Sequence, residues 1–269
     1  MMKPLPAHLP ALLAGALLLA FASGCSTYYT TPGRAANLQA IGANDADLKE
    51  RFETRAAAPF PARVAVIRVQ DAGYHTYSAC GFGEGRYCVV TTHDVEKDED
   101  YAKLAALPQV AGLAAVNRLL LPPRLESVKD LRLACASLHA DMLLLYTFGT
   151  SFKFKDHSVE PLTLVTLGFL PDQEAFITTT ASAALYDVRT GYVYGIAEAT
   201  ETTTHLATHW SKTSVVDNER MKTETAAFAK LIDAFVKTWA GVVKEYGPKN
   251  VGGTVGRDRT AERRARNSE

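Results

Sequence analysis

The sequence lacks an excess of charge of either sign. It contains 29 Lys and Arg residues and 29 Asp and Glu residues, so its formal net charge is +0. Proteins that bind nucleic acid through its phosphates normally carry a clear basic excess. We therefore expect no nucleic-acid partner for this chain.

Long apolar runs are also scarce. The one long run extends from Leu9 to Ala22, behind Lys3, and no later run approaches the roughly 20 apolar residues that a membrane-spanning helix needs. The N-terminal run is itself short for a membrane span and has the length of the hydrophobic region of a secretory signal. It ends in small residues and a cysteine, Ala22-Ser23-Gly24-Cys25. We predict a signal peptide at residues 1–24.

The segment Ala22-Ser23-Gly24-Cys25 resembles the lipobox of bacterial lipoproteins, with Ala22 at the position usually held by leucine. The resemblance implies that Cys25 becomes the first residue of the mature chain and carries acyl chains such as palmitate. Two or more acyl chains anchor a protein stably in a bilayer. Ser26, in place of the aspartate that often signals inner-membrane retention, implies the periplasmic face of the outer membrane. The alternatives are an ordinary signal peptide and a short helix that ends near a cysteine.

Cysteine is rare in the rest of the chain, where only Cys80, Cys88 and Cys135 occur. The periplasm is oxidising, so disulfides form and persist there. Cys80 and Cys88 flank glycines that let the chain turn back, which favours a Cys80–Cys88 disulfide. Cys135 lies in an apolar helical pattern that predicts a buried free thiol. A metal site is the alternative, but a paired C-x-x-C is missing, and we expect no bound metal.

Signatures of catalysis are missing as well. The G-x-S-x-G pattern of a nucleophile elbow does not occur, and Ser151 near Asp156 and His157 lies in a polar turn without a supporting pattern. The glycine-rich segment Gly81–Gly85 lacks the G-x-G-x-x-G spacing of a nucleotide loop. We therefore expect no catalytic residue, no cofactor and no enzymatic activity, with a cryptic hydrolase as the third-ranked alternative.

Three histidines need a separate account. His205 and His209 are four positions apart, a spacing that can hold zinc on a helix. They follow a threonine-rich segment typical of a strand end or loop, so we expect two exposed histidines. His139 ends an apolar helical pattern, and we predict that it lies at the helix C-terminus.

We expect the chain to divide into a tether with a short helix (25–58), one folded domain (59–247) and a disordered basic tail (248–269). Within the domain, Arg63–Val69 has the apolar, β-branched composition of a buried strand. Ser127, with Asp130 three residues later, predicts a capped helix to His139. The apolar segment Asp141–Phe148 then predicts a strand.

The C-terminal half predicts three strands and a long helix. The strands are Leu162–Phe169, Ala175–Asp187 and Tyr192–Thr204, with turn signals at Pro171-Asp172 and Arg189-Thr190-Gly191 between them. A helix from about Val216 to Tyr246 has one continuous apolar stripe, and Gly247-Pro248 ends it. So continuous a stripe needs a partner surface, and we expect it on the sheet. Its members are Phe228, Leu231, Phe235, Trp239, Val242 and Tyr246.

Two segments resemble a group of periplasmic lipoproteins that includes curli-secretion (CsgG-like), TolB amino-terminal-like and penicillin-binding-protein-activator proteins. Leu131 to Leu145 resembles their helix, "x-Ala-Asp" link and strand, and Ala184 to Val193 resembles their "Asp-Val-x-Thr-Gly" hairpin. The chain is also similar to rhombotarget lipoproteins through Gly252-Gly253 and the later arginines, without their membrane helix. The first resemblance implies an α/β sandwich that binds envelope partners.

We predict an α/β (α+β) fold with a mixed or antiparallel sheet packed by helices. The expected function is that of a non-enzymatic, lipid-anchored periplasmic protein that binds partners in assembly or maintenance of the cell envelope. The alternative is an oligomeric, CsgG-like secretion-pore component. In that case Leu162–Phe169 and Ala175–Ala184, which have the length of membrane β-strands, would form a membrane hairpin; we favour an ordinary buried hairpin.

Overall fold

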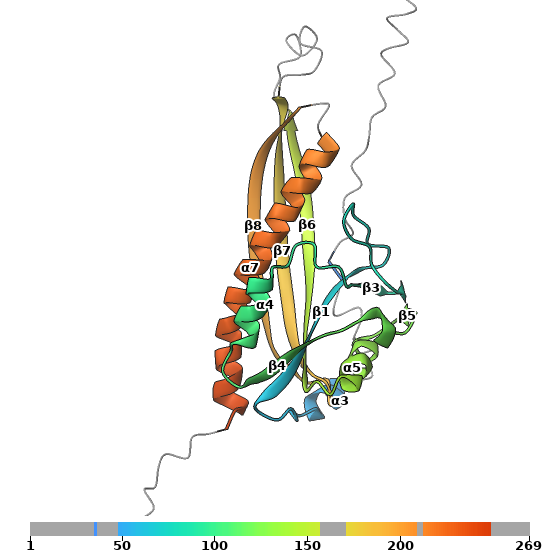
Figure 1. Cartoon of the computed structure of the whole chain (residues 1–269), viewed down its shortest axis with the longest axis vertical. Helices are drawn as coiled ribbons and strands as arrows, with labels where there is room; N and C mark the ends of the chain where they lie inside the picture. The colour runs from blue at the N-terminus through green and yellow to red at the C-terminus, as the bar shows by residue number, and fades with distance from the viewer. Residues whose placement is uncertain (1–34, 37–47, 157–170, 209–211, 249–269) are drawn as a thin grey trace, which may run out of the picture.

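The computed structural model of the chain describes residues 35–36, 48–156, 171–208 and 212–248. It contains a six-stranded sheet, with α7 and α4 on one face and α5 on the other (Figure 1). A pair of two-residue strands lies apart from it. The elements are α3 (Leu48–Glu53), β1 (Ala62–Asp71), β2 (Glu84–Gly85), β3 (Tyr87–Val90), α4 (Asp98–Ala105), β4 (Val110–Ala115), the 3-10 helix η2 (Arg118–Leu120), β5 (Arg124–Leu125), α5 (Val128–Ser137), β6 (Met142–Asp156), β7 (Pro171–Asp187), β8 (Val193–Thr208) and α7 (Lys212–Tyr246).

The sheet is mixed, which confirms the predicted fold class. Its strand order is β3-β1-β6-β7-β8, and β4 lies beside β1. β1 is parallel to β6 and β4, whereas the β1–β3, β6–β7 and β7–β8 pairs are antiparallel. The three long strands β6, β7 and β8 rise together past the rest of the sheet, with α7 along them (Figure 1). We call the three paired strands β6, β7 and β8 the ladder.

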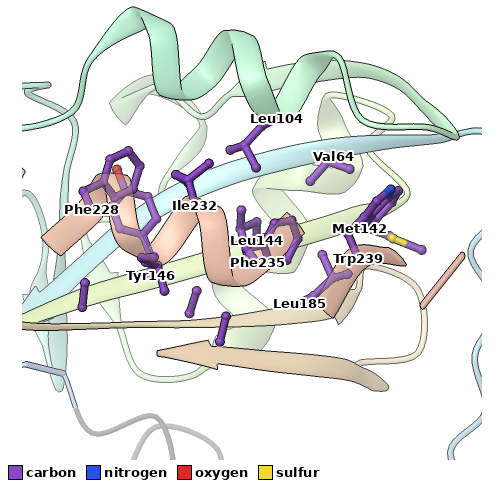
Figure 2. Close-up of a cluster of buried hydrophobic side chains, with 14 of the residues drawn as sticks. Val64, Leu104, Met142, Leu144, Tyr146, Leu185, Phe228, Ile232, Phe235 and Trp239 are labelled. Atoms are coloured by element: carbon purple, nitrogen blue, oxygen red, sulfur yellow. The ribbon is translucent and has the colours of Figure 1, made fainter. Parts of the chain in front are cut away.

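The apolar stripe of α7 packs on the sheet, as its periodicity predicted. Phe228, Leu231, Phe235 and Trp239 are 1–3 % exposed. Figure 2 shows several of these side chains among residues of α4, β1, β6 and β7. The Nε1 of Trp239 also donates to the carbonyl of Pro108 at 2.7 Å. Burying large apolar side chains is the dominant favourable term in folding, so this face fixes the helix on the ladder.

The opposite face is covered by α5, whose ends are set by local chemistry. Asp130 accepts a hydrogen bond from the backbone N–H of Ser127 at 2.8 Å, as in the predicted capping box. At the other end His139 has φ 53, and its N–H donates to the carbonyl of Ala136. The N–H of Ala140 donates to the carbonyl of Cys135, which completes a Schellman motif. The prediction that His139 ends this helix is therefore confirmed.

Two local predictions were wrong, and a third concerns residues outside those that the structure describes. Pro171-Asp172 is not a turn, because β7 begins at Pro171, which pairs with Thr208 of β8. The predicted partner strand Leu162–Phe169 lies outside the described residues. The apolar segment Leu119–Leu121, closed by Pro122-Pro123, also predicts a strand, but Leu119 and Leu120 belong to the 3-10 helix η2. The strand that the sequence did not reveal is β4, Val110–Ala115, whose alanines and glycine have low β-propensity.

Candidate interaction surface

A buried ionic cluster holds α7 against the sheet. Arg68 of β1 is 2 % exposed, and its guanidinium donates to Asp94 at 2.8 Å, to Glu96 at 3.4 Å and to the hydroxyl of Tyr74 at 2.7 Å. The same guanidinium lies over the Phe148 ring, 4.8 Å from its centroid. Arginine is suited to such a site because its planar fork binds carboxylates and also packs on aromatic faces.

The other half of this cluster comes from α7. A carboxylate oxygen of Glu224 lies 3.8 Å from the guanidinium of Arg68 and accepts a 2.5 Å hydrogen bond from Arg220. Arg220 also donates to Asp217 at 3.0 Å, and Thr150 of β6 donates to Glu224 at 2.7 Å. The cluster therefore connects β1, β6 and α7, at side chains that are buried within the fold.

The charges within this cluster depend on one another. Burial lowers the pKa of Arg68, because it opposes the charge of the guanidinium. The neighbouring Glu96, Tyr74, Glu224 and Asp94 outweigh this effect, so the pKa lies above its usual value. Burial raises the pKa of Glu224, and the two guanidiniums oppose that shift. A buried ion pair adds little net stability, but removing one partner leaves an uncompensated charge. The cluster therefore acts chiefly to fix the position of α7 on the sheet.

Two buried nitrogens of the cluster have no hydrogen-bond partner among the described residues, Nε of Arg68 and Nη2 of Arg220. Buried polar groups of this kind are commonly satisfied by ordered water. We interpret both as positions that a water molecule would fill.

A chain of hydroxyls extends the cluster toward the surface. Tyr146 donates to Glu96 at 2.8 Å, and its oxygen lies 3.2 Å from that of Tyr101. His93 Nδ1 lies 2.8 Å from the Tyr101 oxygen. Burial raises the pKa of both tyrosines, so each remains neutral and can donate a proton to a hydrogen bond. This series of hydrogen bonds thus links the loop before α4 to β6.

The hairpin that connects β7 to β8 is held by Asp187. Its Oδ1 accepts from the N–H groups of Arg189 and Thr190, at 2.8 and 3.1 Å. Its Oδ2 accepts from the N–H of Ala57 at 2.7 Å and from the Tyr194 hydroxyl at 2.9 Å. Burial would raise the pKa of Asp187, but these hydrogen bonds to the charged form hold it below its usual value.

Gly191 completes the same turn. Its φ is +78, a conformation that favours glycine, and a Cβ there would lie 2.6 Å from Nη1 of Arg132. Arg132 of α5 donates to the carbonyls of Val188 and Arg189 at 2.9 and 2.6 Å. The Asp-Val-x-Thr-Gly segment singled out in the sequence is therefore a turn that α5 clamps onto the sheet.

Beyond α5, the same face of the ladder is rich in hydroxyl groups. Thr178 pairs with Thr202, and Thr180 pairs with Thr200, with oxygen–oxygen distances of 3.0 and 2.9 Å. Ser182 donates to Glu198 at 2.9 Å. We call this surface the hydroxyl face, and it consists of Ser151, Thr178, Thr180, Ser182, Thr200 and Thr202, all half-buried or exposed.

A segment close to the predicted anchor packs beside this face. The N–H of Ala36 donates to the Thr147 hydroxyl at 3.1 Å, and Ala36 is 6 % exposed. A Cβ placed on Gly149 would lie 3.3 Å from that of Ala35. The tether expected over residues 25–58 is therefore not free along its whole length, since it contacts β6 at these two alanines.

The three cysteines among the described residues are free thiols in this structure. Cys80 is exposed, whereas Cys88 is buried, and burial raises the pKa of its thiol. Its Sγ lies against Gly81, where an added Cβ would be 2.1 Å away, and donates to the carbonyl of Asp71 at 3.1 Å. The structure thus places the Cys88 sulfur beside the residue next to Cys80, and the predicted disulfide remains a prediction. Cys135 is buried in α5, as predicted.

Other residues that the sequence singled out are dispersed. His205 lies in strand β8 rather than on a helix, and His209 is outside the described residues, as are Cys25 and His157. Ser151 is exposed on β6 and is 3.4 Å from the carbonyl of Thr178. Within the ranges described, no three or more His, Cys, Asp or Glu side chains are grouped to hold a metal ion. No helix in those ranges is long and apolar enough to cross a membrane.

Sequence reasoning missed the ionic cluster. The available signals were a single arginine inside the apolar run of β1 and the i, i+4 pair Arg220 and Glu224 on the long helix. Either pattern alone is also typical of a solvated surface. Only the packing of α7 on the sheet brings them together.

Comparisons with known proteins identify no family. No protein-family model matches the chain, and no curated protein does. Among solved structures, a DUF330 protein of Xanthomonas campestris is 10 % identical, with TM-score 0.35. The match covers 71 % of this chain and 94 % of the Xanthomonas chain. A PelC dodecamer from Paraburkholderia phytofirmans is 15 % identical, with TM-score 0.30, covering 67 % and 94 %. A hypothetical protein of Chlamydia trachomatis is 10 % identical, with TM-score 0.30, covering 68 % and 97 %. Likenesses of this size carry no argument about function.

Proposed function

We propose that this chain is a lipid-anchored protein of the periplasmic face of the outer membrane, and that it works by binding an envelope protein through the hydroxyl face. The anchor is Cys25, in the lipobox-like segment that starts at Ala22. The observation that carries the proposal is the contact of Ala35 and Ala36 with β6, because it ties the chain next to the anchor to this face.

The length of the intervening chain limits how far the face can lie from the lipid. Cys25 precedes Ala35 by ten positions, and an extended chain covers about 3.3–3.6 Å per residue, so the reach is at most about 35 Å. A lipid on Cys25 would therefore hold the hydroxyl face near the membrane surface. A partner embedded in or attached to that membrane would meet this face first.

The chemistry of the face suits a protein partner. Serine and threonine hydroxyls can donate and accept hydrogen bonds, so Thr178, Thr180 and Thr202 can serve peptide groups as well as polar side chains. The face lies on a ladder whose opposite side is fixed by α7, so binding requires little ordering of the surface itself. Glu198 at its margin provides one negative charge for orientation.

Site-specific crosslinking in the native envelope tests this proposal. A photoreactive side chain at Thr180 should form a discrete adduct with a partner, and one at Lys222, on the exposed side of α7, should not. Cys25→Ala should release the protein from the membrane and abolish the adduct. Equal labelling at both positions would exclude the hydroxyl face. A Cys25→Ala variant that still sediments with outer membrane after a high-salt wash would exclude the anchor.

A further inference from the structure

β8 forms one end of the sheet. Its only strand partner among the described residues is β7, so no strand pairs with its other side within those residues. One backbone group of β8 has a partner on α7, since the carbonyl of Ile196 accepts a hydrogen bond from the Thr238 hydroxyl at 3.2 Å. The strand is 16 residues long. The strands beyond β1, on the opposite side of the sheet, have 4 and 6 residues. An unpaired strand of this length is a template for pairing with another chain.

The edge carries two charged side chains, Glu198 and Glu201, but lacks other features that usually prevent such pairing. Val193–Thr208 contains no lysine, arginine or proline, and proteins commonly use these residues to protect an edge strand. The irregularities of the β7–β8 register lie at its two ends, which leaves the central part regular. Ile196 is 74 % exposed and Val193 is 41 % exposed. These are large apolar side chains on the strand with nothing described over them.

Symmetry restricts how two copies of β8 can pair. A twofold axis between antiparallel strands is perpendicular to the sheet, so it places both α7 helices on the same face. Residues directly opposite each other point to the same face, so the register must be centred on a residue and not between two residues. Centring on Glu198 or Glu201 would place like charges opposite each other, which is unfavourable. Centring on Thr200 avoids this and gives the longest overlap, residues 193–207 of each copy. Glu198 then lies opposite Thr202 of the second copy.

The same register suits the helix face. Lys230 of α7 pairs with Glu201 of β8 within one chain. In the Thr200-centred arrangement Glu201 lies opposite Ala199 of the second copy, and the two Lys230–Glu201 pairs flank the axis. No like charges of this face then lie directly opposite each other.

We propose that this chain forms a twofold-symmetric dimer through antiparallel pairing of β8 with β8 of a second copy, in the register centred on Thr200. The dimer makes one continuous sheet from the two ladders and doubles the hydroxyl face. The inference stands on the edge strand and does not require the anchor or the envelope partner. Its failure is therefore distinguishable from that of the proposed function.

The test is the mass of the full chain in detergent, measured over a range of concentrations. The wild type should be a dimer. Thr200→Lys places two ammonium groups opposite each other and should shift the protein to monomer. Thr180→Lys, on the neighbouring strand of the same face, is the matched control and should remain a dimer. Thr202→Lys should strengthen the dimer, since each new lysine lies opposite Glu198 of the other copy.

Covalent trapping tests the register directly. Thr200→Cys should give a disulfide-linked dimer on mild oxidation, above any background from the exposed Cys80, whereas Thr180→Cys should not. A wild type that is monomeric at all concentrations overturns the proposal. So does a monomer whose β8 amides are protected from hydrogen exchange, because the chain's own residues would then cover the edge. An oligomer that persists unchanged in Thr200→Lys places the interface elsewhere and overturns it too.

Discussion

A guanidinium nitrogen of Arg68 and a carboxylate oxygen of Glu224 lie 3.8 Å apart, in side chains that are each 1 % exposed. Arg68 belongs to β1 and Glu224 to α7, so the pair joins the start and the end of the folded domain. Arg220 binds the same oxygen. One carboxylate thus faces two buried cations, and the position of the long helix depends on it.

Glu224→Ala should lower the free energy of unfolding by about 3–5 kcal/mol, because it removes the one buried carboxylate that both guanidiniums share. Urea denaturation monitored by circular dichroism measures the change. The matched control is Lys222→Ala on the same helix, which removes an exposed ion pair with Glu219 and should cost less than about 1 kcal/mol. Equal losses in the two variants would contradict a structural role for the buried cluster.

Asp187 should make the domain sensitive to acid. Its pKa is lowered in the folded state, relative to about 3.9 in an unfolded chain. Its contribution is therefore complete above that unfolded value and is lost as pH falls through the lower, folded value. Asp187→Asn should reduce stability by about 1.5–3 kcal/mol at pH 7, as for losing hydrogen bonds to a charged group. Denaturation curves at pH 7 and pH 3 should show the difference shrinking; a constant difference would refute this role.

Trp239→Ala should cost about 3–5 kcal/mol, as for deleting a large buried aromatic side chain. Trp239 is 1 % exposed and its indole donates to the Pro108 carbonyl, so both packing and a hydrogen bond are lost. Thermal unfolding gives the loss, and the mass of the protein in detergent should be unchanged. An unchanged midpoint together with a change of oligomeric state would instead identify the α7 stripe as an interface.

Protein isolated from an oxidising compartment should contain a Cys80–Cys88 disulfide. The bond would close a short glycine-containing loop. It would stabilise the folded state by about 2–3 kcal/mol, because it restricts the conformations of the unfolded chain. Thiol counting on the unreduced, denatured mature protein should then find Cys135 alone. Three reactive thiols would show that Cys80 and Cys88 remain as they are in this structure, free.

The elements that could be predicted from the sequence are those fixed by local physics. The stripe of α7 repeats every three or four residues over its C-terminal half, and Gly247 follows its last residue, Tyr246. The Ser127–Asp130 pair and the Asp187–Gly191 turn work in the same way, because each satisfies backbone groups within a few positions. Such signals do not depend on where the rest of the chain lies.

Contacts between segments that are distant in the sequence were decided only by the tertiary structure. β4 has weak intrinsic preference for a strand and exists because β1 offers it a parallel partner. β7 begins at Pro171 because β8 pairs with it there, at Thr208, which overrides the turn signal of Pro171-Asp172. Arg68 and Glu224 look like ordinary charged residues in the sequence, and only the packing of α7 on the sheet brings them together. The sequence by itself determined the helices, the Asp187–Gly191 turn and the apolar stripe of α7. The edge strand, the hydroxyl face and the ionic cluster follow from strand order and helix placement. Strand order and helix placement were decided only by the tertiary structure, because they depend on burying apolar surface across the whole chain.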